Sequence, residues 1–294
     1  MTALEEARAH LEAAEYRQAR EAALGGLASQ PDDVELLRVA GKAGVELGEE
    51  DSVEQLQRVV ELRPDDAAGW HDLGDALATE GRTEEAAEAF GKAVELNPDD
   101  EMALTQLGHT AFAAGKDEDA VSYLNRAADH ATGTSTAAIS LVDMYRTLGQ
   151  FEEALAAAQK VAGADPDDVV AALDVAELSL ATGRLDDAVE AFERARVIED
   201  LPDHEVYALH GLVQVEIQRE NWDRALELTR DALALDQHGR TSDVLAFLEA
   251  QTGGESEEPP PTREQVDAAL VASQSEHRRE HGEDRRLEGG DLLG

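Results

Sequence analysis

Apolar residues recur along the chain in a pattern that repeats after 34 positions. Within residues 67–100, one apolar stripe with helical spacing ends at Gly81, and a second stripe ends at Pro98. The residues that make up the two stripes are Trp70, Leu73, Gly74, Leu77, Ala86, Phe90 and Ala93. The spacing therefore predicts a pair of helices joined by a glycine turn.

The same spacing recurs on both sides of this block. We predict seven repeats, at residues 1–33, 34–66, 67–100, 101–134, 135–168, 169–202 and 206–239. Residues 203–205 do not fit the period, and we expect them to lengthen a turn. A further apolar stretch at residues 240–251 predicts a helix that caps the last repeat. Residues 1–251 would then form one array.

The most regular positions of the repeat hold small or aromatic residues. A single helix pair cannot bury its own apolar stripe, so each repeat has to pack on its neighbours. Small residues such as Gly74 and Ala86 would let helices approach closely, while Trp70 and Phe90 would fill the wider gaps. We therefore assign structural roles to these residues and expect no catalytic residue among them.

The repeat resembles the tetratricopeptide repeat family over residues 1–239, and most closely in residues 67–100. The resemblance implies an all-α fold, a right-handed α-solenoid of antiparallel helix pairs. It also implies that a concave groove binds an extended peptide or a helix of a partner protein. The function implied is that of a scaffold or adaptor without an enzymatic activity or a cofactor.

The resemblance further implies which residues face a partner. In this family the second, fifth, ninth and twelfth residues of each repeat point into the groove. The candidate partner-binding residues are Arg38, Lys42, His71, Asp75, Met102, His109, Phe112, Ile139, Arg146, Leu173, Tyr207 and His210. We expect the apolar residues among them, and also Leu180 and Ile217, to be exposed in the groove.

The charges at these positions differ from those of the whole chain. Acidic residues are few there, whereas basic or titratable residues such as Arg38, Lys42 and Arg146 recur. This pattern favours an acidic, amphipathic peptide or helix as the partner, with apolar anchors for affinity and bases for orientation. Chaperone-binding members of the family hold a carboxylate with asparagines. Asp75 and His109 stand at those positions here, so we expect a different ligand.

The C-terminal residues have another composition. Residues 252–261 are rich in glycine, proline and acids, which predicts a flexible linker. Thr262 and Gln265 have the spacing of a capping box, which predicts a short amphipathic helix at the start of residues 262–294, followed by a disordered tail. Within it, residues 276–288 carry four arginines against five acids and are nearly neutral, so this stretch would either dock on the acidic array or bind an external partner.

Few residues in this sequence match a catalytic or metal-binding motif. His277, Glu280 and His281 match the spelling of a zinc-peptidase motif, but that chemistry also needs a third ligand and a closed cavity, so we expect no metal site. Our first hypothesis is therefore a protein-binding adaptor. The second is an assembly or regulatory subunit that acts through its C-terminal segment, with the array as a spacer. A metal-dependent enzyme is the third and weakest.

The composition of the chain bears on its ligands, its source organism and its location in the cell. The 65 acidic and 25 basic side chains give a formal charge of −40, which should repel nucleic acids and anionic membranes. Lysines are scarce, and the acidic surplus resembles proteins of extreme halophiles, which favours a halophilic archaeon as the source; a general acidic bias is the alternative. Without cysteines or a long apolar run, we expect a soluble cytoplasmic protein.

The charge leads to a prediction about salt. At molar salt the Debye length is about 3 Å, so the carboxylates repel one another little, whereas in dilute buffer they destabilise the compact chain. We expect the helical content to fall when salt is lowered from molar to tens of millimolar, as measured by circular dichroism. An unchanged spectrum and an unchanged thermal midpoint across that range would remove the halophile argument.

Overall fold

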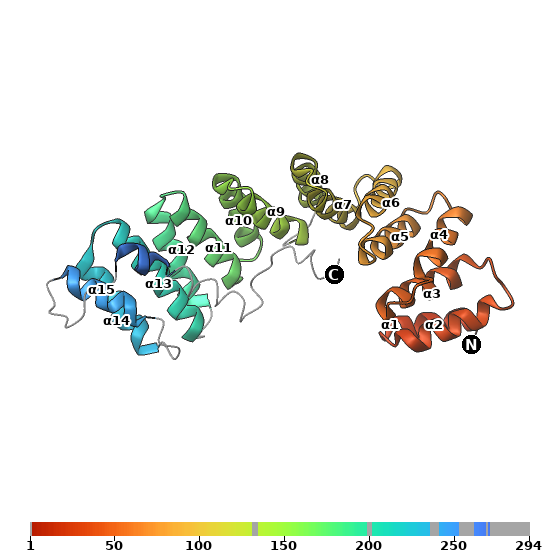
Figure 1. Ribbon diagram of the computed structural model, residues 1–294, viewed down its shortest axis with the longest axis horizontal. Coiled ribbons are helices and arrows are strands. Elements are labelled where there is room, and N and C mark those ends of the chain that lie inside the picture. Colours follow the sequence, from red (N-terminus) through yellow and green to blue (C-terminus); the bar gives the residue numbers. More distant parts are fainter. Residues whose placement is uncertain are drawn as a thin grey trace. The chain divides into compact units, whose positions relative to one another are not determined.

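The computed structural model describes residues 2–130, 135–198, 202–235, 241–252 and 262–268 together with Leu270, and the structural statements below concern these residues. They form α-helices joined by turns, with no strand among them (Figure 1). The helices are α1 (Ala3–Glu12), α2 (Tyr16–Leu27), α3 (Val34–Leu47), α4 (Ser52–Leu62), α5 (Ala67–Thr79), α6 (Thr83–Leu96), α7 (Glu101–Ala113), α8 (Asp117–His130), α9 (Thr136–Thr147), α10 (Phe151–Ala164), α11 (Val169–Ala181), α12 (Leu185–Ile198), α13 (Pro202–Gln218), α14 (Trp222–Leu235) and α15 (Ser242–Gln251).

The helices group into two compact bodies. The N-terminal body contains α1–α8, and the C-terminal body contains α9–α15 together with the C-terminal segment, by which we mean residues 262–268 and Leu270. Within each body, every helix packs against the next one along the chain. This succession of helix pairs is an all-α solenoid and confirms the predicted fold class. We call the odd-numbered helices first helices and the even-numbered ones second helices.

Acidic side chains begin several first helices. Asp33 accepts hydrogen bonds of 3.1 Å from the backbone N–H groups of Glu35 and Leu36, and Asp168 caps α11 in the same way through Ala171. An aspartate in this position satisfies N–H groups that have no partner inside the helix, and its charge suits the positive end of the helix dipole. The second aspartate after the proline of the repeat is thus a helix cap.

Glycine follows five of the first helices because the turn there requires a left-handed backbone. Gly48, Gly81, Gly115, Gly149 and Gly183 have φ angles of 68°, 72°, 71°, 70° and 74°. At the corresponding turn after α13, Glu220 takes a φ of 56°. The left-handed turn is therefore present after α13 even though a glutamate stands there in place of glycine.

The two helices of a pair approach closely where a large side chain meets a glycine. A Cβ atom on Gly74 would lie 2.6 Å from the ring of Phe90, and one on Gly108 would lie 2.7 Å from Leu124. These distances leave no room for a larger residue unless the facing side chain or its helix moves. The small residues of the repeat are therefore required by packing.

One expectation about a turn is wrong. Residues 203–205 belong to α13, which begins at Pro202, and do not lengthen the turn before it. Proline suits the first position of a helix because the N–H group that it lacks would have no helical partner there. Glu205 also accepts a hydrogen bond of 3.0 Å from Arg196 of α12, which ties the added helical turn to its neighbour.

Several parts of the chain lie outside the described residues. They include the predicted linker from residue 253 onward, the predicted tail beyond residue 270, and the motif formed by His277, Glu280 and His281.

Candidate functional site

The candidate groove residues lie on first helices in both bodies. In the N-terminal body we call the side of α3, α5 and α7 that carries them the first-helix surface. Its candidate residues are Arg38, Lys42, His71, Asp75, Met102, His109 and Phe112. The candidates of the C-terminal body, which lie on α9, α11 and α13, are described separately.

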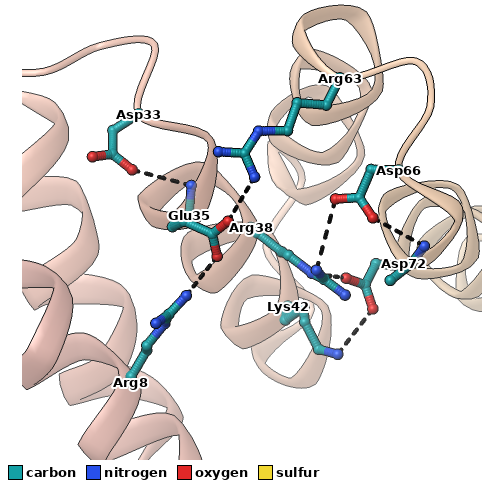
Figure 2. Close-up of polar contacts among 9 residues, drawn as sticks. Arg8, Asp33, Glu35, Arg38, Lys42, Arg63, Asp66 and Asp72 are labelled. Carbon is teal, nitrogen blue, oxygen red and sulfur yellow. Dashed lines mark hydrogen bonds and ion pairs between the residues drawn. The ribbon is translucent and has the colours of Figure 1, made fainter.

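A buried aspartate binds two of the predicted groove cations. The carboxylate of Asp72 on α5 is 4% exposed and accepts hydrogen bonds from Arg38 Nε and, at 2.9 Å, from Lys42 Nζ, both on α3 (Figure 2). Asp66, the cap of α5, lies 3.9 Å from the Arg38 guanidinium. A buried carboxylate needs such partners because burial removes its hydration. Arg38 and Lys42 thus join α3 to α5, and their predicted contact with a partner stays a prediction.

A second bridge lies beside the first. Glu35 of α3 accepts a hydrogen bond of 2.6 Å from Arg8 of α1 and one of 2.8 Å from Arg63 at the end of α4 (Figure 2). Partial burial alone would raise the pKa of Glu35, but the bonds from the two arginines outweigh it and leave the pKa below 4.5. The Glu35 carboxylate therefore stays charged and links three helical elements.

The middle of the first-helix surface carries a polar cluster of different character. Asp75 lies 3.4 Å from His71 Nδ1 and accepts a hydrogen bond of 3.4 Å from Gln106 of α7. Burial raises the pKa of Asp75, the nearby charge of Asp72 adds to that effect, and His71, Lys42 and Gln106 oppose it. The ring of His71 also packs edge-on against Phe90 at 5.6 Å. The cluster joins α5 to α7.

Apolar surface is accessible on α7. Met102 is 63% exposed, and Phe112 on the same helix is half-buried. His109 lies between them in sequence and is also half-buried, and burial lowers its pKa, which favours the neutral imidazole at pH 7. Met102 and Phe112 are ten positions apart on α7, so each offers a separate apolar contact to another surface.

The C-terminal body has an ion pair of the same kind. Arg146 of α9 donates a hydrogen bond of 3.0 Å to Asp174 of α11 and lies 3.4 Å from Glu177. Asp174 is buried, as Asp72 is. Ile139, on the same helix as Arg146, is half-buried and packs against the apolar cluster of α10 and α11. Arg146 therefore joins two first helices.

Three predicted groove residues of the C-terminal body are buried and not exposed. Leu173 and Tyr207 belong to one apolar cluster, and the Tyr207 hydroxyl donates a hydrogen bond to Glu177 of the neighbouring first helix. His210 is fully enclosed, with its Nε2 atom 3.1 Å from the Thr241 hydroxyl at the start of α15. Ile217 is buried too, while Leu180 is half-buried. The expected exposure fails here because neighbouring helices cover these positions.

The acids that bind these cations are not among the residues predicted from the sequence. Asp72 and Asp174 occupy the same position in their repeats, and both are buried within a first helix. An acid among buried residues indicates a charged partner nearby, because an unpaired buried carboxylate is destabilising. Their separation from Arg38 and Arg146, by 34 and 28 residues, places each partner in the preceding repeat.

A cavity of about 470 Å³ lies elsewhere in the N-terminal body, between α4, α5 and α6. Trp70, Leu73 and Leu77 form part of its apolar wall, and it involves none of the candidate groove residues. The described residues contain no group of three or more histidines or acids that could hold a metal ion. Among the described helices, none has the length and apolar character needed to cross a bilayer.

The buried ion pairs lead to a prediction about stability. We expect Asp72→Ala to lower the free energy of unfolding by about 2 kcal/mol, because Arg38 and Lys42 lose a buried partner but can turn toward water. Asp65→Ala, at an exposed position in the turn before α5, should change it by less than about 0.5 kcal/mol. Urea unfolding at molar salt measures both; equal effects of the two substitutions would contradict the bridging role of Asp72.

The repeat of this chain is similar to a repeat of known proteins. Two models of the tetratricopeptide repeat match the chain, one at residues 145–211 and the other at residues 50–101, 71–135 and 105–169. Together they cover residues 50–211 without a gap, which is more than half of the chain. No curated protein sequence matches the chain.

Solved structures with the same repeat are similar in fold. The C-terminal part of a TPR repeat-containing protein from Cytophaga hutchinsonii is 16% identical, with a TM-score of 0.70 over 82% of this chain and 99% of that one. YrrB, described as a TPR protein with an unusual peptide-binding site, is 20% identical, with a TM-score of 0.54 over 68% of this chain and 99% of its own.

PilW, described as a widely conserved type IV pilus biogenesis factor, is 21% identical, with a TM-score of 0.54 over 66% of this chain and 90% of its own. At such low sequence identities, the similarity shows a shared fold and nothing more. The family matches and the succession of helix pairs lead to one conclusion: the chain belongs to the tetratricopeptide repeat family.

Proposed function

We propose that this chain is a protein-interaction adaptor, without enzymatic activity, that binds a peptide or helix of a partner on the first-helix surface of its N-terminal body. The observation that carries the proposal is the accessibility of two apolar residues on α7, where Met102 is 63% exposed and Phe112 is half-buried. Proteins of this repeat family bind other proteins or peptides. YrrB, which shares the fold, is described as having a peptide-binding site.

The polar part of this surface supports a role in orientation more than in affinity. Arg38 and Lys42 already pair with Asp72, so a partner's acid would compete with an internal carboxylate. The Lys42 side chain is 45% exposed and has three N–H donors, so it retains the capacity to bind a second carboxylate. An amphipathic partner with an acidic residue near its apolar anchors therefore remains the partner that we propose.

Salt affects which interactions would matter most. We place the adaptor in the cytoplasm of an extreme halophile, because the formal charge of −40 suits a medium of molar salt. Exposed ion pairs contribute little under such screening, whereas apolar contacts are retained or strengthened. Met102 and Phe112 would then supply most of the affinity.

A second candidate function rests on the C-terminal segment. In that alternative the chain is an assembly or regulatory subunit, and the segment recruits the partner while the array is a spacer. The burial of Val266 and Leu270 in the C-terminal body bears on this alternative, because a recruiting segment would have to leave that position.

Substitution of Met102 and Phe112 tests the adaptor proposal. We expect Met102→Ala combined with Phe112→Ala to reduce partner recovery at least tenfold in pull-downs at molar salt, because about 1.4 kcal/mol of lost apolar contact corresponds to tenfold in affinity. The matched control is Leu96→Ala combined with Val197→Ala, two exposed apolar residues on the second helices α6 and α12.

Recovered proteins are compared by quantitative mass spectrometry, and circular dichroism verifies that both variants remain helical. The control should recover the same proteins as the unchanged chain. If the variant with Met102→Ala and Phe112→Ala also recovers the same proteins, these two residues are not part of the binding site.

A further inference from the structure

The C-terminal segment buries one side of a short helix. Val266 and Leu270, four residues apart, are each 0% exposed, whereas the residues from Thr262 to Gln265 are exposed. Both belong to the apolar cluster that runs through α11–α15, and the segment lies at the same end of the C-terminal body as α13, α14 and α15 (Figure 1). Residues four apart lie on the same side of a helix, so two adjacent anchors attach the segment.

The segment has the local features of a second helix. Its start is a capping box, in which the Thr262 N–H donates to Gln265 Oε1 at 2.8 Å and the Gln265 N–H donates to the Thr262 hydroxyl at 3.3 Å. Val266 and Leu270 follow Thr262 by four and eight residues. In α6, the buried Ala86 and Phe90 follow the cap residue Arg82 by the same numbers.

The burial of α15 fits the role of a first helix with a partner. Val244 and Leu248 on one side of α15 are fully buried and share the apolar cluster with Val266 and Leu270. Phe247 faces α14, where its ring packs edge-on against Trp222 at 6.2 Å. The side of α15 that carries Glu249 is exposed. The segment thus supplies apolar cover at the end of the array.

The attachment of the segment differs from that of the other second helices. Elsewhere a short turn joins the two helices of a pair and is closed by a backbone hydrogen bond, for example of 2.9 Å from the Arg82 N–H to the Leu77 carbonyl. Here ten residues, 252–261, separate α15 from Thr262. Within the described part of the chain, the polar contacts of the segment all lie inside it, including the Arg263–Asp267 ion pair at 3.7 Å.

We propose that α15 carries a helix-docking site whose resting occupant is the chain's own C-terminal segment, held by Val266 and Leu270 in an exchangeable way. The site takes an amphipathic helix with two aliphatic residues one turn apart. Attachment through two side chains and a long connection makes release of the segment compatible with a folded array. Release opens the apolar cluster that contains Val244 and Leu248 to another helix of the same pattern.

The cysteine-free chain allows a direct test of burial and exchange. We expect a single cysteine introduced by Val266→Cys to react with a maleimide at least tenfold more slowly than one introduced by Ala268→Cys, the exposed control on the same helix. Both measurements use the full chain at molar salt. Equal reaction rates at the two positions would overturn the proposed burial.

A peptide with the sequence of residues 262–274 tests exchange. At a concentration on the order of millimolar, which matches the local concentration of a tethered segment, it should raise the reaction rate at position 266 several-fold and leave position 268 unchanged. A peptide carrying Val266→Asp and Leu270→Asp is the control and should change the reaction rate at neither position. A slow rate at position 266 that the unmodified peptide cannot raise would overturn exchange and identify a permanent helix pair.

A second measurement does not depend on the cysteine variants. The full chain carrying Val266→Asp and Leu270→Asp should release its segment and bind the fluorescently labelled peptide at least tenfold more tightly than the unchanged chain does. Circular dichroism establishes that the array is folded. A folded variant that binds the peptide no better than the unchanged chain contradicts a docking site on α15.

Discussion

The contact between a glycine of the first helix and a large side chain of the second helix is the constraint on which the rest of the structure depends. Phe90 against Gly74 and Leu124 against Gly108 set how closely the helices of a pair approach. A pair held in this way still has an uncovered apolar side and must pack on the next pair. This stacking brings residues from successive repeats together, as with Arg38 and Asp72, which are 34 residues apart.

The stacking of repeats also determines which acids the few basic residues pair with. The chain has 25 basic against 65 acidic side chains, and the cations Arg38, Lys42 and Arg146 pair with buried or half-buried acids of the following repeat. Cations that join helices are less available to a partner. Recognition on the first-helix surface would therefore depend more on apolar contacts, with Met102 as the most accessible candidate.

The repeat pattern alone predicted the fold and the positions of small residues, because helix periodicity and close packing are properties of a single pair. It could not predict the burial of Leu173, Tyr207 and His210. A residue's place in the repeat gives its direction on its own helix, whereas its exposure depends on what the next repeat places over it. The Tyr207 contact with Glu177 and the His210 contact with Thr241 arise from such neighbours.

Photocrosslinking from position 102 tests the central claim, recognition through the first-helix surface, most directly. A photoreactive amino acid replaces Met102 in one chain and, in a matched chain, Val197, which is 82% exposed on the second helix α12. After irradiation in native high-salt extract, the account predicts a discrete protein adduct from position 102 and none from position 197. An adduct from position 197 without one from position 102 would contradict it.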